Sequence, residues 1–429
     1  MLPPPQVLEV AAAYPPYDAP SSAPPVIAPA DRTFAAFGGG FSSSGLAPVC
    51  GPAPQRNTVN CFNLAKAGGF LGSYPLPGGV SATPQYFGQS WLFGTTKGYL
   101  MRVDSQSTSW PLPHLGKEST ALWGRFARDF LLGYKPAPLY RDGENTPPPS
   151  PQPPLPQGVK WLFAGSAPFV GTPLVTSSAV YVASASQYVQ SFDWQTGKLN
   201  WALRLAPESN LRLASQGLAL LEDTNELLVG NSLGSLMVLD SSSGQVKWSW
   251  TIAGATTSER VQGALPTGPD KFTGVVAEPL VLRGRRVVAS NAESLTEFVS
   301  LDARASGWRY PAGSVTKPLF YPAADAVILG TSRGQIVSLN VDTGRPVWST
   351  HLDRQEPIIS MMLIKDHYAL AALSQGQIVL VDLRTGKLVA HSPQSMIGPV
   401  NGGFFTGMPH ADACLSFASA GFRCFRVKL

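Results

Sequence analysis

The pentapeptide Gly-Asn-Ser-Leu-Gly at 230–234 is the part of the chain whose residue types and spacing point most directly to catalysis. It has the G-x-S-x-G spacing that carries the nucleophilic serine of many esterases and lipases, which makes Ser232 a candidate nucleophile. Such a serine lies on a sharp turn from a strand into a helix. Residues 235–240 instead form a short apolar run that is typical of a buried strand. We therefore expect Ser232 to lie in a tight turn and not at a catalytic centre.

The same spacing returns at two other places, as Gly-Thr-Thr-Lys-Gly at 94–98 and Gly-Thr-Ser-Arg-Gly at 330–334. In each copy the second glycine stands six positions before an Asp or Asn. A catalytic serine is not expected three times in register. Hairpin turns are expected, because glycine supplies positive φ angles and Ser or Thr hydrogen-bonds back to the main chain. We predict equivalent turns around Thr96, Ser232 and Ser332.

A longer repeat surrounds these turns. Each unit has two apolar runs, then the glycine turn and a third run that ends at the Asp or Asn, and finally the phrase Asp-x-x-Thr-Gly-x-x-x-Trp or a close variant. Two copies read as shortened, from Asp104 to Trp110 and from Asp302 to Trp308, and Asp382 leads to Ala390. The best copies comprise Asp193, Gly197, Trp201, Asp240, Gly244, Trp248, Asn340, Gly344 and Trp348.

Each unit therefore reads as four short strands, and seven units can be counted up to a degenerate last copy near Val427. Four-stranded sheets repeated in this way form a β-propeller, which leaves only short edges exposed. We predict an all-β propeller of four-stranded antiparallel blades, seven in number with eight as the alternative. Residues 1–68 are assigned to an extended, proline-rich N-terminal arm and residues 69–429 to the propeller.

Two insertions interrupt the units. Residues 117–157 hold a predicted short helix followed by a polyproline spacer, and we place them between the first and second blades. The helix presents Trp123, Phe126 and Phe130 at helical spacing, which serve either to pack on the propeller or to bind a partner. A second insertion covers about 253–272. Both are interpreted as connections from the fourth strand of one blade to the first strand of the next.

The last unit ends after its third strand, so its open edge needs a strand from the N-terminal side. We predict that residues 69–76 supply it by pairing with 423–427, which leaves residues 1–48 outside the ring.

The four cysteines come as two close pairs, Cys50 with Cys61 and Cys414 with Cys424. The second pair flanks a predicted hairpin turn, where opposite residues approach closely enough for a disulfide. The first pair is expected to close a loop in the arm. Disulfides favour an oxidising compartment, although the chain begins without a signal peptide. We therefore expect a processed protein in the periplasm or another extracytoplasmic space.

Composition excludes several classes of function. No window holds about twenty consecutive apolar residues, so no transmembrane segment is predicted. The net charge of +5 is small, and the one basic group, Arg283, Arg285 and Arg286, is interpreted as a solvated turn, which argues against nucleic acid as a partner. The five histidines have no metal-ligand spacing, and the chain lacks a phosphate-binding loop motif. We assign no catalytic, cofactor-binding or metal-ligating residue.

The phrase that ends at tryptophan resembles the docking motif of the PQQ-like (quinoprotein-type) propeller repeat, and this resemblance covers roughly residues 80–429. It implies that the tryptophan of one blade packs between blades, so the nine residues of the best copies are expected to be structural. The chain is similar to the non-catalytic branch that includes the propeller lipoprotein of the outer-membrane β-barrel assembly machinery.

That resemblance implies a structural or adaptor subunit of a bacterial cell-envelope complex. Such a subunit binds other proteins, including membrane proteins at their periphery, through one propeller face and the N-terminal arm. The alternative is a propeller enzyme, either PQQ-dependent and dehydrogenase-like or a hydrolase, that uses the central funnel.

Overall fold

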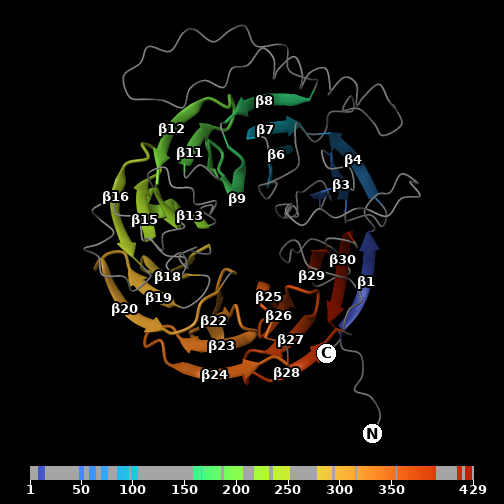
Figure 1. The fold of residues 1–429 in the computed structure, drawn as a ribbon, viewed down its shortest axis with the longest axis vertical. Helices are drawn as coiled ribbons and strands as arrows, with labels where there is room; N and C mark the ends of the chain where they lie inside the picture. The colour runs from blue at the N-terminus through green and yellow to red at the C-terminus, as the bar shows by residue number, and fades with distance from the viewer. Residues whose placement is uncertain are drawn as a thin grey trace, which may run out of the picture. The chain divides into compact units, whose positions relative to one another are not determined.

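The computed structural model describes residues 8–14, 48–52, 58–63, 69–75, 85–95, 98–104, 158–165, 167–184, 188–205, 217–230, 235–251, 278–291, 295–314, 316–353, 355–392, 413–417 and 421–427. These residues form antiparallel sheets, six with four strands and two with three (Figure 1). Helix within them is limited to two single turns, η1 (Glu222–Thr224) and η3 (Pro322–Ala324). The prediction of an all-β chain built from four-stranded antiparallel units is confirmed.

The chain divides into two compact units, and residues 16–202 make up one of them. Its three sheets are β2–β3–β4 (Pro48–Pro52, Thr58–Asn63, Gly69–Pro75), β5–β8 (Gln85–Phe87, Ser90–Gly94, Tyr99–Asp104, Val159–Ala164) and β9–β12 (Phe169–Val175, Ala179–Ser184, Tyr188–Asp193, Leu199–Arg204).

The other unit combines residues 1–15 with residues 203–429. Its sheets are β13–β16 (Gly217–Leu221, Glu226–Gly230, Ser235–Asp240, Val246–Thr251), β17–β20 (Leu280–Leu282, Arg286–Ser290, Thr296–Ser300, Ala305–Tyr310), β21–β24 (Leu319–Tyr321, Ala326–Gly330, Gln335–Asn340, Pro346–His351), β25–β28 (Ile358–Ile364, Tyr368–Leu373, Ile378–Asp382, Leu388–His391) and β1–β30–β29 (Leu8–Tyr14, Gly421–Val427, Ala413–Phe417).

Within each unit, neighbouring sheets share apolar clusters, which explains why their inner strands are apolar on both sides. All five residues of β22, for example, are buried. Val238 of β15 lies in one apolar cluster with Val287 of β18, and the opposite face of the second sheet supplies Val288 to a cluster with Val337 of β23. A strand that is buried on both faces has no need for polar alternation, so the repeat is recognised by its turns more than by its strands.

The hairpin turns predicted from the repeated glycines lie between the second and third strands of the sheets. Gly330 pairs with Ile336 across one of them, and there the Thr331 hydroxyl accepts a hydrogen bond from the Gln335 amide at 3.0 Å. Thr96 and Ser232 lie outside the described residues. The strands on either side of 231–234, β14 and β15, pair antiparallel, so this segment joins two strands and does not lead into a helix.

The prediction for the closing strand was wrong. Strand β1 pairs antiparallel with β30, with Leu8 opposite Val427, so the first strand of the chain lies beside the last (blue and red in Figure 1). Residues 69–75 pair instead with β3, their neighbour in the sequence. A local hairpin costs less loop-closure entropy than a pairing across the whole chain, which favours this use of 69–75.

The same pairing corrects the assignment of the N-terminal arm. Residues 8–14 belong to a sheet, although residues 1–48 were expected to remain outside the ring. The predicted boundary between 68 and 69 falls between β3 and β4, inside one sheet, so it does not separate two parts of the fold. The sheet β2–β3–β4 is also not among the seven units that were counted in the sequence. The number of blades stays a prediction.

The first insertion also lies elsewhere than predicted. Strand β8 pairs with β7, so residues 105–157 connect the third and fourth strands of one sheet and do not connect two blades. The repeat therefore resumes at Trp161, not at Trp110. The predicted helix with Trp123, Phe126 and Phe130 lies outside the described residues. The second insertion follows β16 and precedes β17, as predicted.

Candidate functional site

Tryptophans of the fourth strands reach the turns of the sheets that follow them. Trp308 of β20 donates its indole N–H to the carbonyl oxygen of Val341 at 2.8 Å, and Trp348 of β24 donates to Leu383 at 3.0 Å. In the other unit, Trp161 of β8 donates to the carbonyl oxygen of Trp194 at 2.9 Å. Each acceptor directly follows the last residue of a third strand.

The glycine of the receiving turn has no room for a side chain. Gly344 has a φ of +65°, and a Cβ atom there would lie 2.5 Å from the ring of Trp308. Gly197 has a φ of +70°, and a Cβ atom would meet Trp161 at the same distance. The turn therefore needs glycine for its backbone conformation and also for the close approach of the indole.

The acidic residue of each repeat stabilises its own turn. Asp240 accepts hydrogen bonds from the backbone amides of Ser242 and Ser243, and both hydroxyls also donate to it. These bonds, led by the one from the Ser242 hydroxyl, lower the pKa of Asp240 to about 2. Asp193 is bound in the same way by Thr196, which lowers its pKa, and Asn340 accepts from Thr343.

The remaining residues of the predicted motif lie at equivalent places. Gly244 has a φ of +72°, as in the turns above. Trp201 is buried beside the ring of Tyr181, with the ring centroids 6.1 Å apart. Trp248 packs against the apolar cluster that contains Val238 and Leu301.

One repeat position was assigned two residues too late. Arg286 opens β18 and pairs with Ser300, as Glu226 pairs with Asp240 in the preceding sheet. Ser300, not Asp302, therefore occupies the turn position, and its hydroxyl accepts a hydrogen bond from the Ala303 amide at 3.2 Å. The unit from Ser300 to Trp308 then has the standard spacing and is not shortened.

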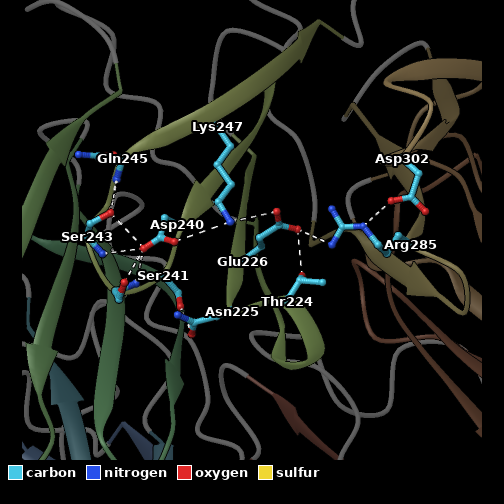
Figure 2. Close-up of polar contacts among 11 residues, drawn as sticks. Thr224, Asn225, Glu226, Asp240, Ser241, Ser243, Gln245, Lys247, Arg285 and Asp302 are labelled. Carbon is cyan, nitrogen blue, oxygen red and sulfur yellow. Dashed lines mark hydrogen bonds and ion pairs between the residues drawn. The ribbon is translucent and has the colours of Figure 1, made fainter.

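Asp302 belongs to a network of charges that joins sheet β13–β16 to sheet β17–β20 (Figure 2). Its centre is the buried carboxylate of Glu226, whose Oε1 lies 3.2 Å from Lys247 Nζ. The other oxygen lies 2.6 Å from Arg285 and accepts a hydrogen bond from the Thr224 hydroxyl at 3.0 Å. Arg285 continues to Asp302 at 2.7 Å. Figure 2 shows Lys247 and Arg285 approaching Glu226 from opposite sides.

Local turns place these side chains. Glu226 begins β14 directly after Asn225, a left-handed residue with φ +52°, which is held by a hydrogen bond from the Ser241 hydroxyl. Gly284 and Arg285 both have positive φ, +72° and +53°, and lie in the three-residue connection 283–285 between β17 and β18. This tight connection presents Arg285 to the preceding sheet.

Electrostatics keep this network charged. Burial alone would raise the pKa of Glu226, but hydrogen bonds from Arg285, Lys247 and Thr224 hold that pKa below its ordinary value. The pKa of Arg285 is raised, chiefly by Glu226. A carboxylate with donors on both oxygens and a lowered pKa is a poor proton acceptor at neutral pH. The network can tie two sheets together, but it is not arranged for acid–base chemistry.

The next residue extends the connection in the other direction. Arg286 lies 3.0 Å from Asp342, which follows the third strand of sheet β21–β24. Neighbouring arginines therefore bind the preceding and the following sheet. The interpretation of Arg283, Arg285 and Arg286 as a merely solvated turn was wrong for the last two. Glu226 begins a second strand whereas Asp342 lies two residues after a third strand, so the repeat marks no common acidic position for this pairing.

The other unit has a different polar connection, which sequence reasoning missed. Arg102 of β7 is buried, and its guanidinium lies 4.2 Å above the ring of Trp194. It donates to the Trp194 carbonyl oxygen at 2.8 Å, to Ser90 at 3.1 Å and to Gln195 at 3.1 Å. Burial lowers the pKa of Arg102, and Asp104 partly offsets this effect. Arg102 lies within an apolar strand, where no repeat position marked it.

Two further findings concern only the described residues. They contain no group of three or more His, Cys, Asp or Glu side chains arranged to hold a metal ion. They also contain no helix that is long and apolar enough to cross a membrane.

The four-stranded units, their turn glycines and the tryptophans bound to neighbouring turns define a β-propeller of PQQ-like repeats. The chain belongs to the family described as outer membrane protein assembly factor BamB, whose sequence profile matches residues 157–350 and 320–402, more than half of the chain.

Individual relatives are distant. The BamB of Burkholderia pseudomallei (strain K96243) is 24% identical over 239 residues, which cover 52% of this chain and 55% of that protein. The dehydrogenase subunit of a quinone alcohol dehydrogenase from Gluconobacter oxydans (strain 621H) is 23% identical over 304 residues, 54% of this chain and 40% of that protein. The chain thus spans about half the length of the curated BamB relatives it matches.

A solved structure has the same fold over almost the whole chain. The crystal structure of BamB from Moraxella catarrhalis superposes with a TM-score of 0.65 at 14% identity and covers 98% of this chain and 99% of that one. This likeness confirms the propeller fold.

Proposed function

We propose that the protein is a non-catalytic structural or adaptor subunit of a multiprotein complex in the bacterial cell envelope, located in the periplasm or at the outer membrane. The observation that carries the proposal is the match of residues 157–402 to a family of outer membrane protein assembly factors. Its partners are other protein subunits, including membrane proteins that it contacts at their periphery.

The contacts between sheets support this role. The tryptophans and the buried charged residues described above are engaged in joining neighbouring sheets, and Glu226 has donors on both of its oxygens. Rigid joints preorganise the loops at the sheet edges, and preorganised surfaces lose less entropy when they bind a partner.

We place partner binding at the sheet edge that carries the second-to-third-strand turns and the connections between sheets. The insertion at 253–272 emerges at this edge, because it lies between β16 and β17. Residues 117–157 emerge at the opposite edge of their own sheet, because they lie between its third and fourth strands. The arm is proposed to contribute through the stretch between β1 and β2.

Two deletions test this proposal with a matched control. The full chain is tagged, expressed in its native host and purified after crosslinking, and the attached proteins are identified by mass spectrometry. We expect envelope proteins to co-purify, to be lost when 253–272 is replaced by a short Gly/Ser linker, and to be retained when 117–157 is replaced in the same way.

Loss of the partners only with the second deletion would contradict the chosen edge and would assign binding to the segment of Trp123, Phe126 and Phe130. The absence of any envelope partner from the intact protein would contradict the adaptor proposal itself. Both variants are compared at equal thermal stability, so that a folding defect is not counted as a binding defect.

The second candidate is a quinoprotein enzyme, and the similarity to the quinone alcohol dehydrogenase subunit favours it. The described residues do not fit the cofactor PQQ with its calcium ion: the indole N–H groups of Trp161, Trp308 and Trp348 are engaged between sheets, and no described side chains are grouped to hold a metal. No two cysteines are adjacent in the sequence. Titration of the protein with PQQ and calcium, followed by absorbance and dye-linked alcohol oxidation, is expected to show neither binding nor turnover.

A further inference from the structure

All four cysteines of the chain lie in paired strands, and each has another cysteine as its partner. Cys50 of β2 stands directly opposite Cys61 of β3, and Cys414 of β29 stands directly opposite Cys424 of β30. The two sheets belong to different units of the chain, so the two coincidences are independent of each other.

This register suits a covalent bond. Directly opposite residues of antiparallel strands have Cα atoms about 4.5 or 5.5 Å apart, depending on the pair type. Disulfides span Cα separations of about 4.4–6.8 Å, so neither hairpin has to move to form one. A slip of one residue in either hairpin would end the direct pairing and place the two cysteines on opposite faces.

We propose that both pairs are disulfides and that the bond between Cys414 and Cys424 fastens the sheet on which the chain closes. In each pair two thiols lose two protons and two electrons to a thiol–disulfide oxidant, whose own disulfide is reduced to two thiols. The proposed extracytoplasmic location supplies oxidants of this class.

The position of Cys424 gives the second bond its particular role. Strand β30 is the central strand of its sheet, and Cys424 stands opposite Cys414 on one side and Ala12 of β1 on the other. Strand β1 comes from the opposite end of the chain, so no local turn sets its register against β30. A bond across the β29–β30 hairpin holds β30 in the register against which β1 pairs.

Among the described residues, side-chain contacts with sheet β25–β28 hold one face of this sheet. Phe425 and Val427 are buried in an apolar cluster with Ile378 and Leu380 of sheet β25–β28, and Lys365 Nζ donates to the carbonyl oxygen of Val427. The other edge of β30 depends on its pairing with β1. We therefore expect loss of the disulfide to loosen residues 8–14 first.

The pairing itself is tested with the full chain refolded in a glutathione redox buffer, alkylated and digested without reduction. We expect peptides linked as 50–61 and 414–424 only, and an intact mass lower by two hydrogen atoms for each bond. Free thiols at 414 and 424, or links between the two pairs, would overturn the proposal whatever the function of the protein.

The same peptide analysis is then made on protein that a bacterial host has secreted into an oxidising compartment. Linked peptides in the refolded protein but free thiols in the secreted protein would contradict a role of the bonds in the cell. The adaptor function would still be tested separately, by the proteins that co-purify. Linked peptides in both preparations support the proposal.

The closing role is tested by hydrogen exchange in Cys414→Ser/Cys424→Ser, with Cys50→Ser/Cys61→Ser as the matched control. Exchange in residues 8–14 is expected to rise by roughly tenfold or more in the first variant and to stay near the wild-type rate in the control. Reduction of the wild type should reproduce the first result. Equal exchange in both variants would contradict the closing role.

Discussion

Two joints between sheets perform the same task with different chemistry. At the first, between β5–β8 and β9–β12, the buried Arg102 lies over the Trp194 ring and donates to neutral acceptors. At the second, between β13–β16 and β17–β20, Arg285 pairs with the carboxylates of Glu226 and Asp302. One joint holds a desolvated cation by hydrogen bonds and an aromatic face, and the other balances its charges.

The difference shows where each joint is vulnerable. A buried guanidinium depends on every donor being satisfied, because an unpaired charge in the interior is very costly. At the second joint the cations Lys247 and Arg285 are partly exposed, so water and the remaining donor compensate in part when one of them is removed. The first joint should therefore be sensitive to shape and hydrogen bonding, and the second to salt and pH.

The largest effect is expected where both units use the same device, at the turn glycine beneath a tryptophan. Gly197→Ala and Gly344→Ala each add a Cβ atom 2.5 Å from an indole ring at a positive φ. We expect a loss of about 3 kcal/mol or more in the free energy of unfolding for each. Thermal and denaturant unfolding measure it.

Gly284→Ala is the matched control for this prediction. Gly284 has a similar φ of +72°, but the nearest atom to an added Cβ is at 4.0 Å. This variant should lose only about 1 kcal/mol, which reflects the backbone conformation alone. Equal losses at all three glycines would mean that the contact with tryptophan contributes nothing.

The second effect sharpens the contrast at Arg102. Arg102→Met keeps most of the buried volume but removes every donor to Trp194, Ser90 and Gln195. We expect a loss of about 2–3 kcal/mol, which salt leaves nearly unchanged because the site is buried. Arg102→Lys should recover only part of it, since an ammonium group cannot reproduce the planar contact with the ring. If Arg102→Lys recovered the full free energy of unfolding, the positive charge alone would account for the effect, and the planar contact with the ring would contribute nothing.

The third effect concerns Arg285, which lies in the ion network. Arg285→Gln should cost about 1–2 kcal/mol at low salt, and the cost should shrink as salt is raised to about 0.5 M. Arg283→Gln is the matched control, because Arg283 lies in the same connection between β17 and β18 and the described residues form no ion pair with it. The variant makes the same change in net charge. It should alter stability by less than about 0.5 kcal/mol. Identical salt responses would attribute the effect to net charge.

The repeat phrase explains how much of this architecture the sequence predicts. Gly344 lies in a turn with a positive φ, and Trp348 lies on a fourth strand and donates its indole N–H to the next turn, so both positions constrain the residue type. The phrase failed where a turn accepts Ser300 in place of Asp, since a serine hydroxyl accepts the same backbone hydrogen bond.

Contacts that join distant segments were predicted less well. The pairing of residues 8–14 with β30 depends on long-range register, and a short apolar strand such as Leu8–Tyr14 carries no mark of its partner. Arg102 was missed for the same reason, because its acceptors are mainly backbone and neutral groups in the following sheet. A turn is specified by a few residues that are adjacent in the sequence, so a short motif predicts it. Contacts between sheets join residues that are distant in the sequence, so no short motif predicts them.

The smallest effect is the pH dependence of the ion network. The pKa of Glu226 lies below its ordinary value of 4.5, so the carboxylate stabilises the folded protein above that pH, and the contribution is lost as the pH falls through the lowered pKa. Glu226→Gln cannot titrate, so its deficit relative to wild type, under about 1 kcal/mol, should shrink as the pH falls below 4.5. The carboxylate of Asp240 has a pKa of about 2, so it stays largely charged down to about pH 3 and contributes little to this change. Denaturant unfolding of both proteins between neutral pH and pH 3 measures the difference. If the gap stays constant or widens on acidification, Glu226 is not ionised in the folded protein, and the second joint is held by hydrogen bonds as the first one is.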